Sequence, residues 1–415
     1  MRILVTAPPF AGHLDRLIPL IHAAQAKGHL VRVLTGHARL PFLQAQGIAA
    51  AAPPSLAPGA LEHIAEGFGR ITGRPHAALA QLRANLALLP ALTEDLCHEI
   101  HQWRPDVLVA DSVALMAGPA AARTGIPWVT MLASPLSLHS PTGTPTFCGG
   151  WCPPTGPLGR ARDALGRLGH VALRHAVFAL CRNSLPPEIA RPFRPDGTET
   201  IYSPTAILGL GLPELEFPRQ WPPAFTMIGP VASAPSLDPP PDLPQASRRI
   251  FATIGTHLPW ARAAFHAALA RLAADRPDWV ILLSEGRMTG AAQPPQPMGR
   301  GPQNLLVLPR LCYRRDLPRF DAVIHHGGTG ISYSAIAAGL PSLVLPQDFD
   351  QFDMAARIAW HGLGLRARKG AALAPQLDRL LAQDWPALAR FRALAARHDP
   401  AARFLEVLHR VTAGA

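Results

Sequence analysis

The chain has 415 residues, of which 48% are hydrophobic and 16% are charged. This composition excludes a disordered protein, and the length exceeds what one hydrophobic core usually serves, so we expect two domains of roughly 200 residues each. The 39 basic and 28 acidic residues give a net charge of +11, which favours an anionic partner, but the arginines are scattered singly, so a nucleic-acid-binding protein is not expected.

The first residues, MRILVTAPPFAGH, predict a β-strand rather than a targeting segment, because the apolar run is short and no cleavage site follows it. No segment approaches the roughly 18 to 20 apolar residues that cross a bilayer, so a cytoplasmic protein is expected. The cysteines are odd in number, which is typical of free thiols in a reducing compartment. Cys148 and Cys152 lack a second pair at zinc-site spacing, so no metal site is expected there.

Strands and helices alternate along the first half of the chain. We predict strands at 2–6, 30–34, 106–110 and 128–131, and helices at 16–27 and 112–124. Parallel crossover units of this kind indicate a Rossmann-like sheet. The stretches 52–80 and 137–160 are rich in Pro, Gly and Ser, and we interpret both as functional loops. Their aromatic residues either line an acceptor site or anchor the loops: Phe68, Phe147 and Trp151.

The proline-rich segment 229–245 predicts a semi-rigid linker. A second alternation follows it, with strands at 249–255, 279–284, 304–309, 321–326 and 341–346 and helices at 261–274 and 330–339. We therefore predict an α/β protein in which two Rossmann-like parallel-sheet domains face each other across a cleft, where ligands bind at the carboxyl ends of the strands. The predicted parts are a domain 1–229, a linker 230–246, a domain 247–385 and a helical tail 386–415, for which a return to the first domain is one option.

The segment VIHHGGTGISYS, residues 323–334, closes a predicted strand and opens a helix. Adjacent side chains on a strand point to opposite faces, so only one of His325 and His326 can face the cleft. Glycines allow a close backbone approach, and the helix N-terminus attracts an anion, so this turn is a good receptor for a diphosphate. Asp350 and Gln351 follow the next strand and can bind several hydroxyls, as a sugar requires.

Residues 325–365 resemble the C-terminal signature of glycosyltransferase family 1, the inverting enzymes of GT-B fold that include bacterial natural-product, macrolide and rhamnolipid glycosyltransferases. The resemblance extends more loosely to IGTH at 254–257 and to NLLVLPRLCYRRDLPRFDAVIHH. It implies that the nucleotide sugar is bound as follows: the diphosphate by His326 with Gly328, Gly330 and Thr256, the sugar by Asp350 and Gln351, and the base near Leu311.

The chain departs from the family pattern in its donor half. Ile331 stands where the family usually has a Ser or Thr that donates to a phosphate, and Cys312 replaces a common proline. Ser332 is the candidate for the missing hydroxyl. One hydrogen bond to an anion is worth roughly 1.5 to 3 kcal/mol, so the affinity for the donor depends on whether a hydroxyl contacts the phosphate.

The segment FAGHLDRLIPL, residues 10–20, is similar to the GHxxP-type segment of the family, although Asp15 and Arg16 replace the usual small or proline residues. The resemblance implies that His13 is the general base, since a neutral imidazole can take a proton from an acceptor hydroxyl. Asp111, at the end of a strand on the same rim, is the carboxylate that would orient this imidazole.

The sequence thus predicts an inverting glycosyltransferase of the hexosyltransferase class that moves a sugar from a UDP- or dTDP-sugar to a hydroxyl of an apolar acceptor, a natural product or a lipid. No metal and no cofactor are expected: the DFD at 348–350 spells a metal-binding DxD, but it follows a late strand, and we interpret Asp348 as a loop carboxylate. The alternatives are a nucleotide-sugar epimerase of the same architecture and a non-catalytic partner protein. A lipid acceptor would bring the protein to the inner membrane surface, and the oligomeric state stays open.

Overall fold

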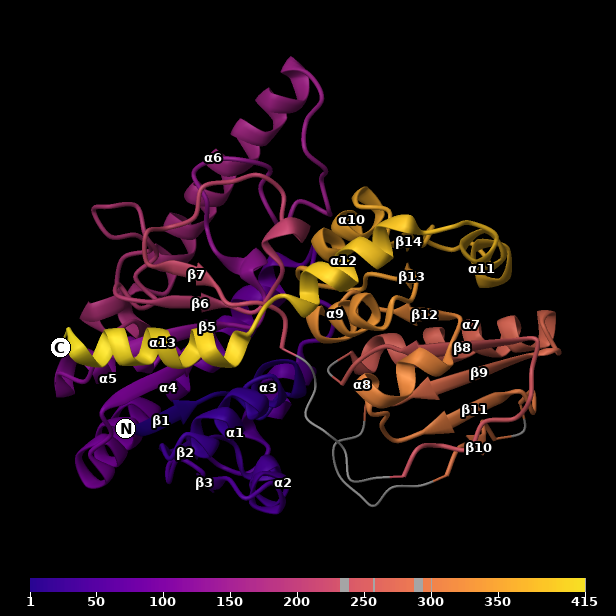
Figure 1. The fold of residues 1–415 in the computed structure, drawn as a ribbon. Coiled ribbons are helices and arrows are strands. Elements are labelled where there is room, and N and C mark those ends of the chain that lie inside the picture. Colours follow the sequence, from indigo (N-terminus) through magenta and orange to yellow (C-terminus); the bar gives the residue numbers. More distant parts are fainter. Residues whose placement is uncertain (232–238, 257, 287–293, 300, 415) are drawn as a thin grey trace.

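The computed structural model describes residues 1–231, 239–256, 258–286, 294–299 and 301–414. It consists of two α/β domains that stand side by side, each built on a seven-stranded sheet (Figure 1). This arrangement confirms the predicted fold class. All strands of the N-terminal sheet are parallel, in the order β3 (Ala49–Ala51), β2 (Leu30–Leu34), β1 (Arg2–Thr6), β4 (Val107–Asp111), β5 (Trp128–Leu132), β6 (Ile207–Gly209) and β7 (Phe225–Met227).

The C-terminal sheet is parallel except for its edge strand β10, which pairs antiparallel with β11. Its order is β10 (Gln296–Pro297), β11 (Leu305–Leu308), β9 (Trp279–Ser284), β8 (Arg248–Thr253), β12 (Ala322–His325), β13 (Ser342–Val344) and β14 (Gly364–Arg366). The central strands of both sheets are almost continuously apolar and buried, because helices cover both faces of a parallel sheet. The predicted strands in both halves are confirmed to within one or two residues at most ends.

Helices of the N-terminal domain cover the two faces of its sheet. On one face, α1 (Ile18–Ala26) packs on the side chains of Ile3 and Val5. On the other face, α4 (Pro75–Trp103) and α5 (Ala117–Thr124) pack on Leu4 and Leu108. This alternation along each strand follows from the two-residue period of a β-strand. The domain also contains α2 (Leu40–Ala45), α3 (Ala60–Gly67) and α6 (Pro157–Leu180).

The C-terminal sheet is covered in the same way. One face packs against α7 (Pro259–Asp275) and α11 (Leu373–Leu381), and the other packs against α9 (Thr329–Ala338). The remaining helices are α8 (Tyr313–Asp316), α10 (Gln351–Trp360) and α12 (Pro386–Ala396). A short turn connects the end of strand β12 to the first residue of α9. The N-terminus of this helix therefore lies at the carboxyl edge of the sheet.

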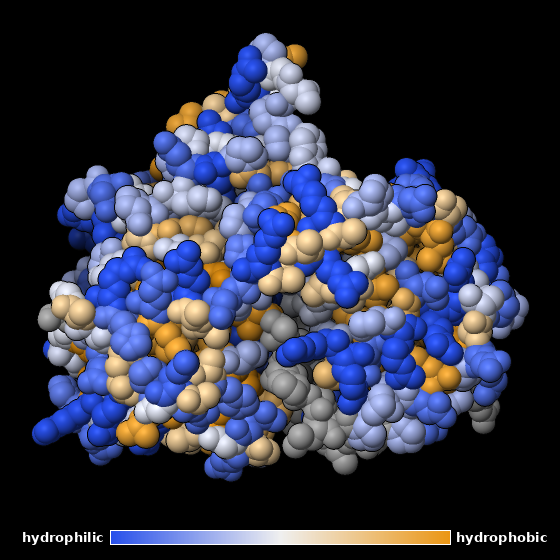
Figure 2. All heavy atoms as spheres, viewed as in Figure 1, coloured by the Kyte–Doolittle hydropathy of each residue, from blue (hydrophilic) through white to orange (hydrophobic). Residues whose placement is uncertain are grey.

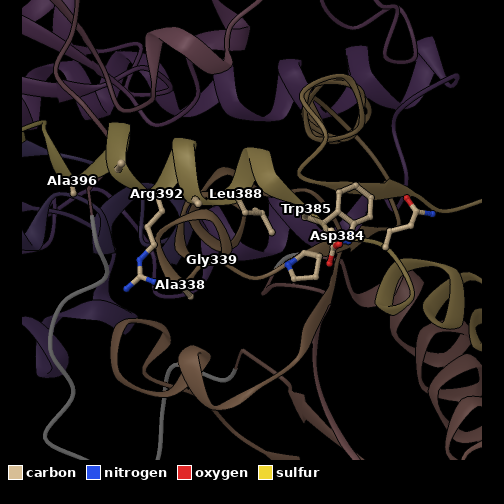
Figure 3. A pocket seen from close by; sticks show the side chains of 11 residues that line it. Ala338, Gly339, Asp384, Trp385, Leu388, Arg392 and Ala396 are labelled. Carbon is tan, nitrogen blue, oxygen red and sulfur yellow. The ribbon is translucent and has the colours of Figure 1, made fainter.

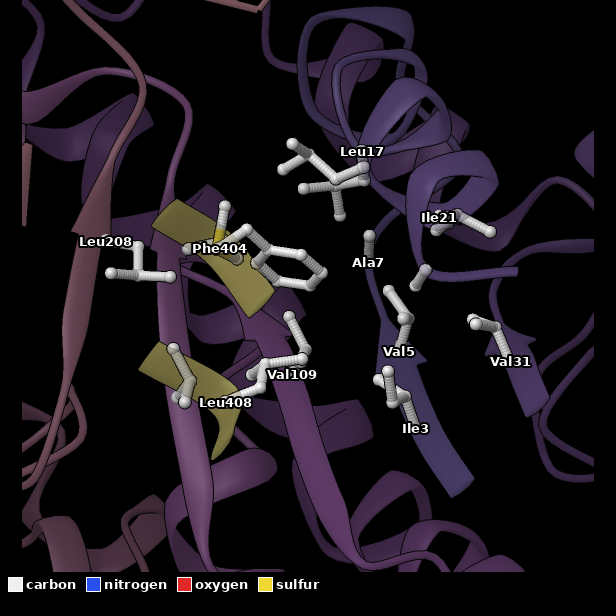
Figure 4. Close-up of a cluster of buried hydrophobic side chains, with 14 of the residues drawn as sticks. Ile3, Val5, Ala7, Leu17, Ile21, Val31, Val109, Leu208, Phe404 and Leu408 are labelled. Atoms are coloured by element: carbon white, nitrogen blue, oxygen red, sulfur yellow. The ribbon is translucent and has the colours of Figure 1, made fainter. Parts of the chain in front are cut away.

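The tail of the chain divides between the two domains. Helix α12 packs beside α9 and α10 in the C-terminal half, whereas α13 (Pro400–Ala413) crosses over and lies against the N-terminal sheet (Figure 1). Phe404 and Leu408 of α13 pack in one buried cluster with Val109 and Leu208 of the N-terminal sheet (Figure 4). The C-terminal helix is therefore part of the N-terminal hydrophobic core.

The predicted loop 52–80 is wrong over much of its length, because it contains α3 and the first turn of the long helix α4. The second predicted loop, 137–160, is irregular up to Gly156, where α6 begins. Helix α6 stands out from the body of the protein (Figure 1) and exposes leucines, among them Leu158 at 88% and Leu165 at 69%. On the face seen in Figure 2, hydrophilic side chains are spread over both domains, and apolar ones form small separate groups.

The two domains share an apolar cluster. Leu136, Leu212 and Leu215 of the N-terminal half pack with residues of α9, α10 and α12 of the C-terminal half. Residues 232–238 of the predicted linker lie outside the described residues, but both flanks of the linker are anchored: Val231 packs in the N-terminal core and Leu243 in the C-terminal core. The two domains are therefore in direct contact through this apolar cluster.

Candidate active site

His13 and Asp111 lie at the carboxyl edge of the N-terminal sheet. His13 belongs to a π-helical turn, Ala11–Asp15, that follows β1, and Asp111 ends the neighbouring strand β4. The ring Nδ1 of His13 lies 3.0 Å from each carboxylate oxygen of Asp111. The Asp111 side chain is 1% exposed and that of His13 is 29% exposed. With Nδ1 donating to Asp111, the Nε2 atom of His13 is the acceptor that can take a proton.

The charges around His13 set its pKa. Burial lowers this pKa, but the charge and hydrogen bond of Asp111, together with the charge of Asp350, outweigh burial, so the net shift is upward from the usual value of 6.5. The positive charge of Arg16 acts in the opposite direction. Asp350 belongs to the C-terminal domain, and its charge acts on His13, so the two groups lie near each other across the boundary between the domains.

The two adjacent histidines face in different directions, as predicted. His325 is fully buried, and its Nδ1 accepts a hydrogen bond of 3.0 Å from the amide of Gly327. His326 is only partly buried, and its ring lies between two glycines: a Cβ atom would be 2.7 Å from the ring at Gly255 and 2.5 Å from it at Gly328. Burial lowers the pKa of His326 to about 4, so its imidazole is neutral at pH 7.

The first turn of α9 lies beside His326. Gly328 is the N-cap of this helix, with φ −63°, and Gly330 follows within the first turn. Amides at the start of a helix have no carbonyl partner inside the helix, so they are available to an anion. Ser332 is fully buried, and its hydroxyl donates to the carbonyl of Gly328 at 2.8 Å, which argues against the role predicted for it. Ile331 packs into the C-terminal core, so this position faces away from the cleft.

The predicted sugar-binding residues lie at the start of α10. Asp350 accepts a hydrogen bond from the hydroxyl of Ser134, which belongs to the N-terminal domain. Burial raises the pKa of Asp350, although this hydrogen bond and the charge of His13 oppose the shift. The amide oxygen of Gln351 accepts from the backbone of Gln347 and Asp348, which leaves its NH2 group for a ligand.

Asp348 is more than the loop carboxylate that we expected. It is fully buried and accepts hydrogen bonds of 2.8 Å from the amides of Ile71 and Thr72, and a further one from the Thr72 hydroxyl. Both partners belong to the N-terminal domain. Asp348 therefore holds a loop of one domain to the turn of the other.

Thr256 and Leu311 lie on the C-terminal side of the cleft. Thr256 follows Gly255, whose φ of +78° belongs to the left-handed region, and the Thr256 carbonyl accepts a hydrogen bond from Arg262. His257 of the IGTH segment lies outside the described residues. Leu311 is partly buried against the C-terminal core, next to Tyr313.

The three aromatic candidates for the acceptor site have different surroundings. Trp151 packs on α6, with the Arg162 guanidinium 4.6 Å from its ring, so it anchors the loop. Phe147 is 47% exposed, and its amide donates to Asp353 of α10 at 2.8 Å. Phe68 is half-buried directly after α3. The cavity beneath the loop 137–160 is small, about 20 Å³, and its lining includes His139, Arg167, His170 and Arg174, which does not suit an apolar acceptor.

A larger surface pocket of about 590 Å³ lies at the other end of α9, between Gly339 and the α12 residues Leu388 and Arg392 (Figure 3). Its volume would suit a small ligand. It contains none of the predicted site residues, so we do not assign it to the donor or the acceptor. Among the described residues, no group of three or more His, Cys, Asp or Glu side chains could hold a metal ion, and no helix could span a membrane.

Several residues that join the two domains were not predicted from the sequence. Ser134 follows β5 and contacts Asp350, and Thr329 at the start of α9 accepts from Arg16 of the N-terminal domain at 2.9 Å. The Thr329 hydroxyl in turn donates to the carbonyl of Ala133. The sequence offered one indication of the contact between Arg16 and Thr329: in the FAGHLDRLIPL segment, an arginine replaces the usual proline or small residue.

Comparison with known proteins identifies relatives for the whole chain. Residues 291–397 match the family described as "Erythromycin biosynthesis protein CIII-like, C-terminal domain". The chain is 31% identical to an L-demethylnoviosyl transferase of Streptomyces niveus, over 88% of this chain and 84% of the relative. It is 29% identical to a 4'-demethylrebeccamycin synthase of Lentzea aerocolonigenes, over 89% and 88% of the two chains.

Solved structures share the fold over almost the entire length. The glycotransferase of kitacinnamycin superposes with a TM-score of 0.72 at 21% identity, covering 99% of both chains. The glycosyltransferase SsfS6 of Streptomyces sp. SF2575, complexed with thymidine diphosphate, has a TM-score of 0.64 at 20% identity, covering 98% of this chain and 99% of the other.

Proposed function

The chain belongs to the GT-B glycosyltransferases of antibiotic biosynthesis, and on that premise we propose that it transfers a sugar, with inversion and without a metal ion, from a dTDP-sugar to a hydroxyl of an apolar natural product. The observation that carries this proposal is the His13–Asp111 pair, which faces Asp350 of the donor domain across the same cleft. A base on one wall and a sugar-binding carboxylate on the other are what a direct displacement requires.

In the proposed reaction, the acceptor hydroxyl lies within hydrogen-bond reach of His13 Nε2. The imidazole takes the hydroxyl proton as the acceptor oxygen forms its bond to the anomeric carbon. Asp111 holds the proton of Nδ1 and stabilises the imidazolium that results. Because the oxygen attacks from the side opposite to the leaving group, the anomeric configuration inverts.

On the donor wall, the bond between the anomeric carbon and the diphosphate oxygen breaks, and its electron pair stays on the diphosphate. The amides at the start of α9 face this developing charge, and His326, neutral at pH 7, can contribute a hydrogen bond. Asp350 and the free NH2 group of Gln351 would bind the sugar hydroxyls. The Ser134 hydrogen bond to Asp350 would then be exchanged for one from the sugar.

The relatives support the donor and the acceptor class. One solved neighbour is a complex with thymidine diphosphate, so we prefer dTDP over UDP. The names of the curated relatives refer to a noviosyl transferase and a rebeccamycin-type synthase, so we place the acceptor among natural products. The exposed side chain of Val113 and the ring of Phe10, 6.3 Å from that of His13, supply apolar surface beside the base.

Ile331 and the Asp15–Arg16 pair depart from the family pattern, and these departures are the features that leave a non-catalytic partner protein open. Ile331 faces the core and not the cleft, and Asp15 forms an ion pair with Arg39. The epimerase alternative needs no acceptor, and the comparisons supply no epimerase in its support, since the relatives named above are transferases and a synthase. Neither alternative is favoured by an observation of its own.

The decisive experiment is His13→Ala. We expect the variant to lose about 10²- to 10⁴-fold in transfer, the usual contribution of a general base, while the midpoint shift of thermal unfolding with dTDP equals that of the wild type. The control is His22→Ala, since His22 lies on α1 and its Nε2 contacts the backbone of Gln46. Normal transfer by His13→Ala would refute the assignment of the base, and conversion of the nucleotide sugar without any acceptor would favour the epimerase.

A further inference from the structure

Arg16 is a buried cation at the boundary of the two domains. The residue is only 5% exposed, and its Nη1 donates to the hydroxyl of Thr329, the first residue of α9, at 2.9 Å. The other two guanidinium nitrogens, Nε and Nη2, are buried and have no hydrogen-bond partner among the described residues. An arginine normally uses its fork of donors fully when it is buried, so two unused donors at this place indicate a missing acceptor.

No carboxylate among the described residues neutralises the charge of Arg16. The neighbouring Asp15 forms its ion pair with Arg39 instead. The guanidinium carbon of Arg16 lies over the ring of Tyr333, 5.8 Å from its centroid, at the distance of a cation–π contact. Burial raises the pKa of this phenol, so it is neutral at pH 7. Burial lowers the pKa of Arg16 to about 10, which still leaves it positively charged.

The surroundings of Arg16 are suited to an anion. Its Nη1 lies 3.8 Å from the position that a Cβ would take at Gly330, so the guanidinium sits against the first turn of α9. The amides at the start of this helix have no carbonyl partner inside the helix, and its dipole is positive at this end. The charge of Arg16 also acts on His13, so Arg16 lies near both the base and the first turn of α9. An unpaired buried cation is costly unless a ligand compensates it.

We propose that Arg16 binds the diphosphate of the donor from the acceptor domain, opposite to the amides of α9, and stabilises the negative charge that the leaving diphosphate gains. This inference rests on the proposed function. When the bond from the anomeric carbon to the diphosphate oxygen breaks, the electron pair remains on that oxygen, and Arg16 Nε and Nη2 donate to the diphosphate. Ile331 contributes no hydroxyl to this turn, and the two donors of Arg16 act in its place.

The test compares nucleotide binding by the full-length wild type and Arg16→Met, measured by titration calorimetry with dTDP, UDP and thymidine. We expect the affinity for the diphosphates to fall by about 10- to 100-fold, as for the loss of a charge-assisted bidentate contact. The affinity for thymidine, which lacks phosphate, should stay within about twofold. Arg16→Lys keeps the charge and should recover part of the affinity, and Arg392→Met, in the pocket at the far end of α9, is the matched control.

Two further measurements separate ligand binding from a structural role. Without ligand, Arg16→Met should unfold at the same or a higher temperature than the wild type, because an uncompensated buried charge is removed; a clear loss of stability would indicate a structural arginine. Thr329→Val removes the hydroxyl that Arg16 contacts and should weaken dTDP binding less than Arg16→Met does. Equal dTDP binding by the wild type and Arg16→Met would overturn the role of Arg16 alone, whereas a wild type that binds neither dTDP nor UDP would overturn the proposed function as well.

Discussion

At the scale of single residues, His13 and His326 differ in pKa because their surroundings differ. His13 is oriented by a buried carboxylate that also raises its pKa, whereas burial between glycines lowers the pKa of His326. The ring of His13 therefore binds a proton more readily than a free imidazole does, whereas the ring of His326 is neutral at pH 7. The two histidines thus differ in pKa because a carboxylate outweighs burial at His13, whereas burial is the larger effect at His326.

The pH dependence of transfer follows from the raised pKa of His13. The base works only when it is neutral, so kcat/KM should rise with pH through a value above 6.5. In Asp111→Asn, burial and Arg16 continue to lower this pKa while the main opposing charge is gone. We expect the acid limb to move to lower pH and the maximal rate to fall by about 10²-fold or more.

A pH profile of kcat/KM for the wild type and Asp111→Asn tests this prediction. Asp106→Asn is the matched control, because Asp106 lies at the other end of the same strand and its carboxylate accepts from the amide of Arg2. Identical acid limbs in the wild type and Asp111→Asn would show that His13 is not the titrating base.

At the scale of elements, helix α9 both presents its first turn at the edge of the sheet and packs its buried residues into the protein core. Its first turn faces the cleft with Gly328 and Gly330, and its buried residues Ile331 and Tyr333 pack into two different cores. A helix that is buried on several sides keeps a fixed position, so its N-terminus is held where the diphosphate is expected.

Helix α13 is the element that ties the end of the chain to its beginning. Phe404 is 2% exposed and packs among the residues of the N-terminal sheet (Figure 4). We expect Phe404→Ala to lower the free energy of unfolding by about 3 to 5 kcal/mol, because a large buried ring leaves a cavity. Chemical denaturation monitors this change. Arg403→Ala on the exposed side of the same helix should change it by less than about 0.5 kcal/mol, and a similar loss in both variants would contradict the packing described.

At the scale of the whole molecule, the segment 348–353 joins the domains. Asp348, Asp350 and Asp353 each accept a hydrogen bond from the N-terminal half, from the loop around Thr72, from Ser134 and from Phe147. Tyr333 and Arg357 add contacts of the same kind through the backbone of Leu212 and the carboxylate of Glu216. The two domains are thus held together by polar contacts around an apolar cluster, and the residues proposed to bind the donor sugar lie among these contacts.

Breaking one of these contacts should open the cleft. Asp348→Ala removes the acceptor of Ile71 and Thr72, each such hydrogen bond to a charged group being worth roughly 1.5 to 3 kcal/mol. We expect a larger radius of gyration in small-angle scattering and a higher KM for the donor. Asp384→Ala, at an exposed position beside α12, is the control. A radius of gyration and KM equal to those of the wild type would show that closure does not depend on Asp348.

Much of the architecture could be predicted from local patterns. Apolar runs such as WVILLS gave the buried strands, and glycines after helices gave their ends. The placement of His13 beside Asp111 was also predictable, because the carboxyl ends of neighbouring parallel strands meet at one edge. The loop 52–80 was not, since its Pro and Gly residues flank helices that tertiary packing stabilises.

By itself, the sequence determined two Rossmann-like domains and the side chains at the edges of their sheets, since backbone periodicity and turn residues act over a few neighbouring positions. Only the tertiary structure decided that α13 completes the N-terminal core, that Ser332 faces its own helix, and that Arg16 lies against Thr329. These contacts join residues that are up to hundreds of positions apart or depend on the rotation of a helix. Their energies arise from the docking of whole surfaces, for which a linear pattern carries no direct signal.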